Sequence, residues 1–286
     1  MKVSKVWDGT DPGATPGRVF TGSIGQETIT QMGKELSFLK IGLKGAVSTA
    51  AVTVEAFVAV LSEYTLRVGV NERIVMDGQD LCALMSFFYN EKPRIGENTD
   101  ATGNDFVGNI KVPIYAPVDN ATPVTHSATR TAVTNIATET LSVSAYWDAG
   151  EAGRKPIHAV KISHTTAASA GIETLGFRIA PVGKLIGLII KQASDFADGN
   201  IDVSVQRVRL LEDGQLHSQF NALGDGRTTA TIDYVTPSPM AGILAPYLTI
   251  DLRPSGIDAK AKEITIQIDV QDVSDAIAII PIMEVA

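Results

Sequence analysis

The sequence of 286 residues contains one cysteine, few aromatic residues and no long apolar run. Its single cysteine, Cys82, cannot form a disulfide within the chain, which fits a reducing compartment. Because the neighbouring residues 81–85 are otherwise apolar, we expect a buried and inert thiol rather than a nucleophile.

The chain also lacks the segments that would direct it to or across a membrane. Its longest apolar runs, residues 185–190 and 276–283, fall short of the roughly 20 residues that span a bilayer. Residues 1–20 contain no apolar core of a signal peptide. We therefore expect a soluble protein that is not secreted by the general route.

No recognisable catalytic or metal-binding motif is present. The sequence has no HExxH, CxxC, GxSxG or Walker motif, and its four histidines have no metal-ligand partner at a useful spacing. The net charge is −8 with both signs scattered, so there is no basic stripe that could follow nucleic-acid phosphates. We predict no enzymatic activity, no catalytic, cofactor-binding or metal-binding residues, no cofactor and no direct sequence-specific binding of nucleic acid.

Two stretches resemble binding sites but have plainer interpretations. Residues 98–103 are similar to the start of a calcium loop, yet the twelfth position holds Asn109 instead of the bidentate glutamate that an EF-hand requires. Tyr146 and Trp147 could form a binding platform, although burial between domains is the favoured interpretation.

Carboxylates are grouped at two places in the second half of the chain. The groups are Asp195 with Asp198, and Asp269 with Asp272 and Asp275. Paired carboxylates can hydrolyse glycosides, but nothing in the sequence places these across a cleft. A solvated loop or strand face is therefore expected for both groups.

Alternation of apolar and polar residues is the dominant pattern and predicts half-buried strands. The clearest example is residues 264–271, and residues 51–60 alternate in the same way. The continuous apolar run 184–190 predicts a strand buried on both faces. Residues 96–109 and 119–131 are polar and are predicted to be long loops.

One helix is clearly predicted after residue 77. Its apolar stripe has the helical spacing i, i+3, i+4, i+7. The residues of the stripe are Leu81, Leu84, Met85 and Phe88. Asp77 or Asp80 can cap the N-terminus, and Pro93 is expected to stop the helix.

A set of short landmarks occurs twice in the same order, which suggests two related β-rich halves. The landmarks are Ile41-Gly42-Leu43 and Asp77-Gly78-Gln79 in the first half, and Ile186-Gly187-Leu188 and Asp213-Gly214-Gln215 in the second. Chance similarity between two β-rich segments is the alternative. In the second copy the alternation shifts phase at Gln206-Arg207, which predicts a β-bulge, and Asp213-Gly214 predicts a type I′ hairpin.

These patterns predict an all-β protein with two tandem antiparallel β-sandwiches, of the jelly-roll type, and one or two short helices. We expect an extended N-terminal arm at residues 1–23, because this segment is rich in glycine and proline. The first jelly roll is expected at 24–147, a linker at 148–156 and the second jelly roll at 157–286.

The two halves, with Asp-Gly turns near residues 77 and 213 and a helix after the first, resemble a double jelly-roll major capsid protein of tailless icosahedral DNA viruses, bacteriophages or archaeal viruses among them. This resemblance implies a structural protein of the virion, assembled in the host cytoplasm. It implies a homotrimer whose six sandwiches form a pseudo-hexagonal capsomer that tiles an icosahedral capsid. The implied partners are neighbouring capsomers, minor capsid or penton proteins, and an internal viral membrane contacted by the N-terminal arm.

Other functions remain open from the sequence. One is a carbohydrate-binding or carbohydrate-cleaving β-sandwich protein. Another is a phage fibre or baseplate protein, or a shell protein with a single jelly roll. A trimer with a hexagonal outline would count against both.

Overall fold

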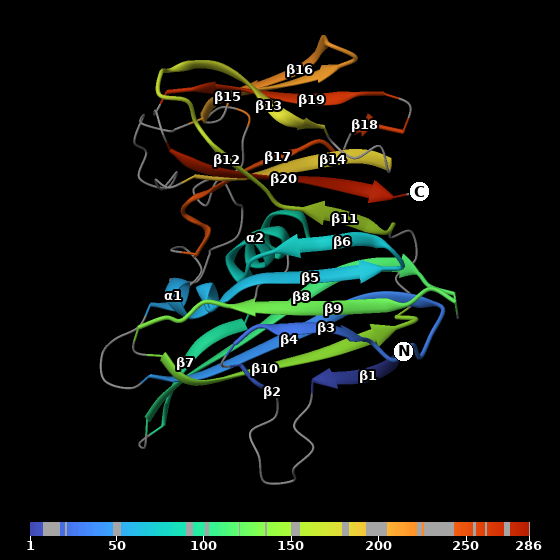
Figure 1. Cartoon of the computed structure of the whole chain (residues 1–286), viewed down its shortest axis with the longest axis vertical. Helices are drawn as coiled ribbons and strands as arrows, with labels where there is room; N and C mark the ends of the chain where they lie inside the picture. Colours follow the sequence, from blue (N-terminus) through green and yellow to red (C-terminus); the bar gives the residue numbers. More distant parts are fainter. Residues whose placement is uncertain are drawn as a thin grey trace. The chain divides into compact units, whose positions relative to one another are not determined.

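The structure is a computed structural model of the whole chain (Figure 1). It describes all residues except 8–17, 21, 48–52, 90–93, 101–102, 120, 135, 150–154, 179–182, 193–204, 222–224, 226–242, 254–255, 261, 272–274 and 286. The chain divides into two compact units, Met1–Ile157 and His158–Ala286.

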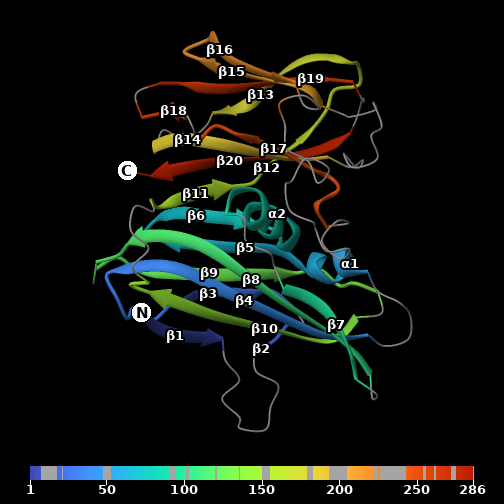
Figure 2. The same ribbon diagram turned by 180° about the vertical axis from the view of Figure 1, so that it is seen from behind.

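The first unit contains two sets of antiparallel strands that form two layers. One sheet has the order β1 (Lys2–Trp7), β10 (Ile136–Trp147), β4 (Glu35–Val47), β8 (Gly103–Pro117), β7 (Arg94–Asp100), with β2 (Arg18–Val19) also paired to β10. The other set has the order β6 (Asn71–Met76), β5 (Leu61–Val68), β9 (Val124–Arg130), β3 (Ile24–Thr28). The set with β9 and β3 lies in front in Figure 1, and the set with β8 and β4 lies in front in Figure 2, which shows the protein from behind.

The second unit is built in the same way. One sheet contains β17 (Tyr247–Asp251), β14 (Gly183–Lys191) and β20 (Ala276–Val285), with β18 (Ile257–Asp258) on β14 and β12 (Ile162–Thr165) on β20. The other has the order β13 (Gly171–Arg178), β19 (Ile264–Val270), β15 (Val205–Glu212), β16 (Gln215–Asn221). Strand β11 (Ile157–Val160) crosses the boundary between the units.

Alternating side chains build both sandwich cores, as the period-two patterns predicted. In β4, Leu39, Ile41 and Leu43 are fully or almost fully buried, while Lys40 between them is exposed. In the second unit, Ile266 and Ile268 of β19 share one apolar cluster with Leu188 of β14, so both sheets contribute to the same core. Burial of these faces drives the sandwich to form, because apolar area removed from water contributes roughly 25 cal/mol per Å².

The run 184–190 is buried on both faces, as predicted. Leu188 and Ile190 belong to the core cluster of the second unit. Ile189, which has the opposite orientation in β14, is also fully buried, as is its cross-strand partner Ile280 in β20. This arrangement explains why the sequence of β14 shows no alternation.

Helix α2 (Gly78–Phe88) confirms the helical stripe. The Asp77 side chain accepts a hydrogen bond from the Asp80 backbone N–H, and the Asp80 side chain accepts one from the Asp77 N–H. This reciprocal capping box satisfies two N–H groups at the helix N-terminus. The helix ends at Phe88; Pro93 lies outside the described residues.

The strand predicted at residues 51–60 is wrong. Residues Val54–Ala59 form the short helix α1, whose N-cap Thr53 accepts a hydrogen bond from the Ala56 N–H. Phe57, Val58 and Val60 are buried. A short apolar run fits either period, and here the side-chain cap and the available core favour the helix.

Both predicted polar loops contain strands. Residues Arg94–Asp100 and Gly103–Pro117 pair as the hairpin β7–β8, which replaces most of the loop expected at 96–109. Residues Val124–Arg130 form β9, which lies between β5 and β3 and replaces the second half of the loop expected at 119–131. Threonine and serine suit a strand when both neighbours satisfy the backbone hydrogen bonds.

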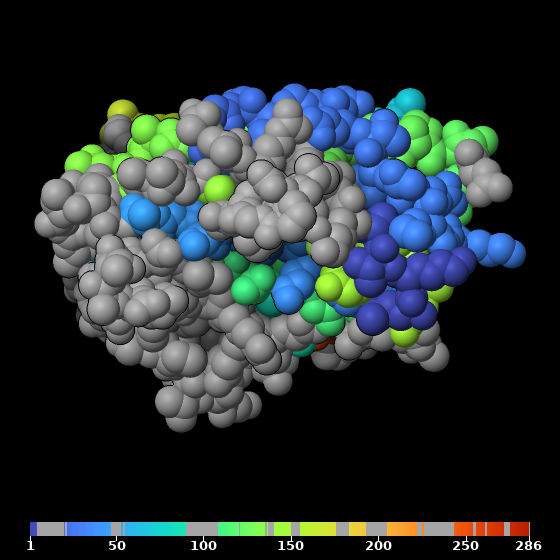
Figure 3. Space-filling view, turned by 90° about the horizontal axis from the view of Figure 1, so that it is seen from below, coloured from blue at the N-terminus to red at the C-terminus, as the bar shows by residue number. Residues whose placement is uncertain are grey.

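Parts of the expected N-terminal arm belong to the first sheet. Strand β1 pairs with β10 from Lys2 opposite Trp147 to Trp7 opposite Val143, and Arg18–Val19 also pair with β10. In Figure 3 the N-terminal segment, in dark blue, lies at the surface of the protein. Residues 8–17 of the arm lie outside the described residues.

The two Asp-Gly landmarks differ in local structure. Asp213 and Gly214, with φ of 49° and 79°, form the tight turn between β15 and β16, which confirms the predicted hairpin. The register of β15 against β19 shifts between Val205 and Arg207, which confirms the predicted bulge. In the first half, by contrast, Asp77-Gly78 begins α2 and makes no hairpin turn.

Gly183 in β14 provides a test of strand packing. A Cβ atom placed on Gly183 would clash with the backbone oxygen of Glu284, whereas one on Gly25 would meet nothing within 4 Å. We expect Gly183→Ala to lower the free energy of unfolding by about 1–3 kcal/mol, because β20 must move away from β14. Thermal unfolding measures the effect, with Gly25→Ala as the control. Equal melting temperatures for the two variants would contradict the close approach.

Candidate functional site

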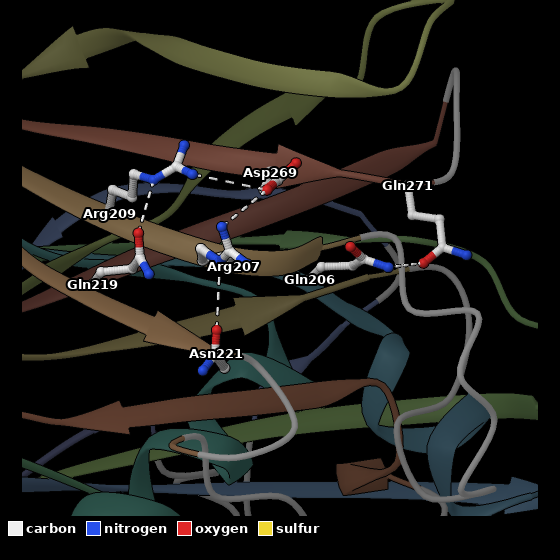
Figure 4. Close-up of polar contacts among 7 residues, drawn as sticks. All are labelled: Gln206, Arg207, Arg209, Gln219, Asn221, Asp269 and Gln271. Carbon is white, nitrogen blue, oxygen red and sulfur yellow. Dashed lines mark hydrogen bonds and ion pairs between the residues drawn. The ribbon is translucent and has the colours of Figure 1, made fainter.

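The outer face of the β13–β19–β15–β16 sheet carries an ordered set of planar polar side chains (Figure 4). We call this set the arginine face. Its members are Arg207 and Arg209 of β15, Gln219 and Asn221 of β16, Gln267 and Asp269 of β19, and Gln271, which follows β19; all but Gln267 are drawn in Figure 4. The strands place them side by side because Val208 and Leu210, which alternate with the arginines, are fully buried in the core.

Each arginine of this face is held by an amide on the neighbouring strand. Arg207 Nε donates to Asn221 Oδ1 at 3.4 Å, and Arg209 Nε donates to Gln219 Oε1 at 3.1 Å. Asp269 lies between the two guanidinium groups, with Oδ2 at 3.7 Å from Arg207 Nη1 and 3.9 Å from Arg209 Nη2. Two cations share one carboxylate, so the face carries a positive charge.

Asp269 therefore forms a cross-strand ion pair. Of the two residues grouped with it in the sequence, Asp272 lies outside the described residues. The backbone N–H of Asp275 donates to the Thr166 hydroxyl at 2.7 Å, at the start of β20. Asp195 and Asp198 also lie outside the described residues.

The other sheet of interest is the β1–β10–β4–β8–β7 sheet, whose outer face combines aromatic and basic side chains. Phe38 and Tyr146 stack with their ring centroids 4.4 Å apart, and Lys111 Nζ lies 4.7 Å from the Phe38 centroid. Lys40 on the same face is exposed. The pair Tyr146-Trp147 is thus divided between the two faces of β10: Tyr146 is half-buried on the outer face, and Trp147 is fully buried within the first unit.

A buried histidine is the strongest electrostatic feature that sequence reasoning missed. His126 of β9 is 1% exposed, and its Nδ1 lies 3.0 Å from the Tyr64 hydroxyl oxygen of β5. Burial lowers the pKa of His126 to about 4, which the nearby Glu27 carboxylate partly opposes. No sequence signal identifies this histidine, because β9 lies within the polar residues 119–131, which were predicted to be a loop.

Among the described residues, the other three histidines and the cysteine show no arrangement that is typical of a catalytic or metal site. His164 Nε2 lies 2.7 Å from Glu173 Oε2, His217 is exposed and close to Glu212, and His158 is half-buried in β11. Burial raises the pKa of the Cys82 thiol, which agrees with the predicted inert thiol.

Within the described part of the chain, no three histidine, cysteine, aspartate or glutamate side chains lie close enough together to hold a metal ion. Of the segment that resembled a calcium loop, residues 98–100 belong to β7 and Gly103 begins β8, with Asp100 paired to Gly103. No helix among the described residues has the length and apolar character that crossing a bilayer requires.

The fold is that of viral major capsid proteins. No protein-family model and no curated protein sequence matches the chain. Among solved structures, the crystal structure of the major capsid protein of Sulfolobus turreted icosahedral virus is similar, with a TM-score of 0.69 and 12% identity over 99% of this chain and 96% of that chain.

Two further capsid structures are similar over nearly the whole chain. The major capsid protein P2 of bacteriophage PM2 has a TM-score of 0.57 and 12% identity, covering 100% of this chain and 97% of that chain. PBCV-1 VP54, fitted into a reconstruction of the virophage Sputnik, has a TM-score of 0.59 and 11% identity, covering 99% and 93%. The chain therefore has the all-β, double jelly-roll fold of these proteins, as the resemblance predicted.

Proposed function

We propose that this protein is the major capsid protein of an icosahedral virus and that it acts as a structural, non-catalytic component of the virion. The observation that supports this most strongly is the match to a viral capsid protein over 99% of this chain and 96% of that one. The similarity thus includes both sandwiches in tandem, not a single β-sandwich of the kind that many unrelated functions share.

The proposed working unit is a homotrimer with a pseudo-hexagonal outline. Each chain supplies two sandwiches of similar construction, so three chains supply six, the number that fills a hexagonal tile. A closed ring repeats one heterologous interface and leaves no unpaired copy of it. An obligate assembly of this kind is expected to bury more than about 2,000 Å² per contact.

The proposed partners are neighbouring capsomers, minor capsid or penton proteins, and an internal viral membrane reached by the N-terminal residues 1–23. The exposed Lys2 is compatible with anionic lipid. Assembly is proposed to take place in the host cytoplasm. No cofactor and no sequence-specific binding of nucleic acid are proposed.

Mass photometry and negative-stain imaging of the purified full-length chain test the proposal. We expect particles of three chains with a six-lobed outline, because two sandwiches per chain are arranged around one threefold axis. A chain that remains monomeric or dimeric at every concentration would contradict the capsid function. A glycosidase or esterase activity that disappears when one carboxylate is mutated would contradict the non-catalytic role.

A further inference from the structure

The composition of the arginine face is typical of a protein–protein interface. Arginine is enriched and lysine and glutamate are depleted at such interfaces relative to other protein surfaces. The seven residues of the arginine face include two arginines, four amides and one aspartate, and neither lysine nor glutamate. Ile172, opposite Asp269 in the β13–β19 register, adds an apolar side chain that is 58% exposed.

The two guanidinium groups keep hydrogen-bonding capacity for a ligand. Each Nε donates to an amide of β16, but the Nη atoms closest to Asp269 are 3.7 and 3.9 Å from its Oδ2. These separations are too long for hydrogen bonds, whose N···O distances are usually 2.7–3.2 Å; the Arg207–Asn221 bond, at 3.4 Å, is itself a weak one. Arg207, whose side chain is 39% exposed against 15% for Arg209, can therefore form bidentate hydrogen bonds through its Nη groups with an incoming carboxylate, the acceptor that arginine matches best in geometry.

The face is ordered before any ligand binds. Gln206 and Gln271 are hydrogen-bonded to each other, and Gln267 Nε2 donates to Thr174 Oγ1 at 2.8 Å. With the two arginine–amide pairs, which Figure 4 shows together with the Gln206–Gln271 bond, these bonds connect all four strands of the sheet. Side chains that are already held in place lose less conformational entropy on association.

Charge indicates which partner the face accepts. The chain has a net charge of −8, so copies of it repel each other except where a positive surface meets a carboxylate. We propose that the arginine face binds a carboxylate-bearing surface of a second copy of this chain in the assembled particle. This inference rests on the proposed capsid function and names one of its contacts. Nucleic acid is disfavoured as the ligand because the Asp269 carboxylate lies between Arg207 and Arg209.

Arginine footprinting with phenylglyoxal tests the inference on the wild-type chain. Arg207 is 39% exposed in the single chain and is expected to be modified in free subunits but protected in assembled particles. Arg253, whose side chain is 42% exposed, serves as the internal reference because it is held by Asp251 of its own chain. Equal modification of Arg207 in free and assembled protein would overturn the inference.

A double variant that removes both arginine charges of the face provides the second measurement. Association of Arg207→Gln/Arg209→Gln subunits is expected to weaken roughly 30-fold, the loss found when a buried charge pair loses one partner. The control variant Arg253→Gln removes one positive charge outside the arginine face, against the two that the double variant removes, and is expected to assemble like the wild type. Wild-type-like assembly of the double variant would contradict the inference. If a lowered melting temperature shows that the double variant is misfolded, the protection of Arg207 in wild-type particles tests the inference instead.

The outcomes separate the two proposals. Wild-type chains that never form trimers would overturn the capsid function and this inference together. Wild-type trimers or shells in which Arg207 stays reactive would overturn this inference alone. Loss of modification on addition of an oligonucleotide to free subunits, with no protection in particles, would assign the face to nucleic acid and also overturn it.

Discussion

Replacing Trp147 with alanine is expected to lower the free energy of unfolding by about 3–5 kcal/mol, the usual loss for a large aromatic side chain removed from a core. Trp147 is fully buried in the first unit, and its Nε1 donates to the Ser4 hydroxyl at 2.9 Å. The substitution would leave a cavity and would remove the hydrogen bond that connects β10 with the N-terminal strand β1. Chemical denaturation followed by circular dichroism measures the loss.

Tyr146→Ala is the matched control, because Tyr146 is the preceding residue and lies on the opposite face of β10. Its side chain is half-buried and stacks on Phe38. We expect a loss of about 1 kcal/mol, the typical contribution of an aromatic pair. If Tyr146→Ala destabilised the protein as much as Trp147→Ala, the assignment of these residues to the two faces of β10 would be wrong.

Acid is expected to destabilise the first unit through His126. The pKa of this histidine is about 4 in the folded protein because it is buried, against 6.5 when it is accessible to solvent. Between these values the unfolded state binds more protons, so stability is fully present above pH 6.5 and decreases as the pH falls towards 4. The loss reaches about 3 kcal/mol at pH 4, since one pKa unit corresponds to about 1.4 kcal/mol.

The groups that face His126 do not reverse this sign. Tyr64, whose hydroxyl is 3.0 Å from Nδ1, is itself fully buried, and burial raises its pKa, so it stays neutral through this range. The Glu27 carboxylate favours the protonated histidine, but its effect is smaller than that of burial. Protonation therefore introduces a charge into the core at a cost that one partly buried carboxylate does not offset.

Melting temperatures measured from pH 7.5 to 4 test this effect in His126→Gln, which cannot be protonated and can still hydrogen-bond to Tyr64. The variant is expected to lose less stability than the wild type over this range. The control, His217→Gln, makes the same substitution at an exposed histidine of the second unit. Carboxylates titrate in all three proteins, so the effect of His126 is the difference between the wild-type and His126→Gln curves of melting temperature against pH. Identical profiles for wild type and His126→Gln would contradict the prediction.

Local patterns predicted much of the fold because they depend on few neighbours. The alternation of residues 264–270, the helical stripe from Leu81 to Phe88 and the hairpin at Asp213-Gly214 are all present in the structure. The phase shift at Gln206-Arg207 also predicted the bulge. In each case the pattern reflects backbone geometry within one element or one turn.

The errors occurred where tertiary contacts outweigh the local pattern. Residues 54–59 fit a strand or a helix by sequence, and the Thr53 cap and burial of Phe57 and Val58 favour the helix. The threonine-rich strand β9 has a polar sequence, yet it lies between two strands that satisfy its backbone. Neither neighbour is close in sequence, so local propensity could not reveal the strand.

By itself, then, the sequence determined the class of the protein: two β-rich halves, one main helix, and the absence of a recognisable catalytic motif. Only the tertiary structure decided which residues share a face. It brings Ser4 to Trp147 across 143 positions, joins Tyr64 to the buried His126, and aligns Arg207 and Arg209 with Asp269 on neighbouring strands. These groupings depend on strand register, which long-range pairing sets and which no local periodicity contains.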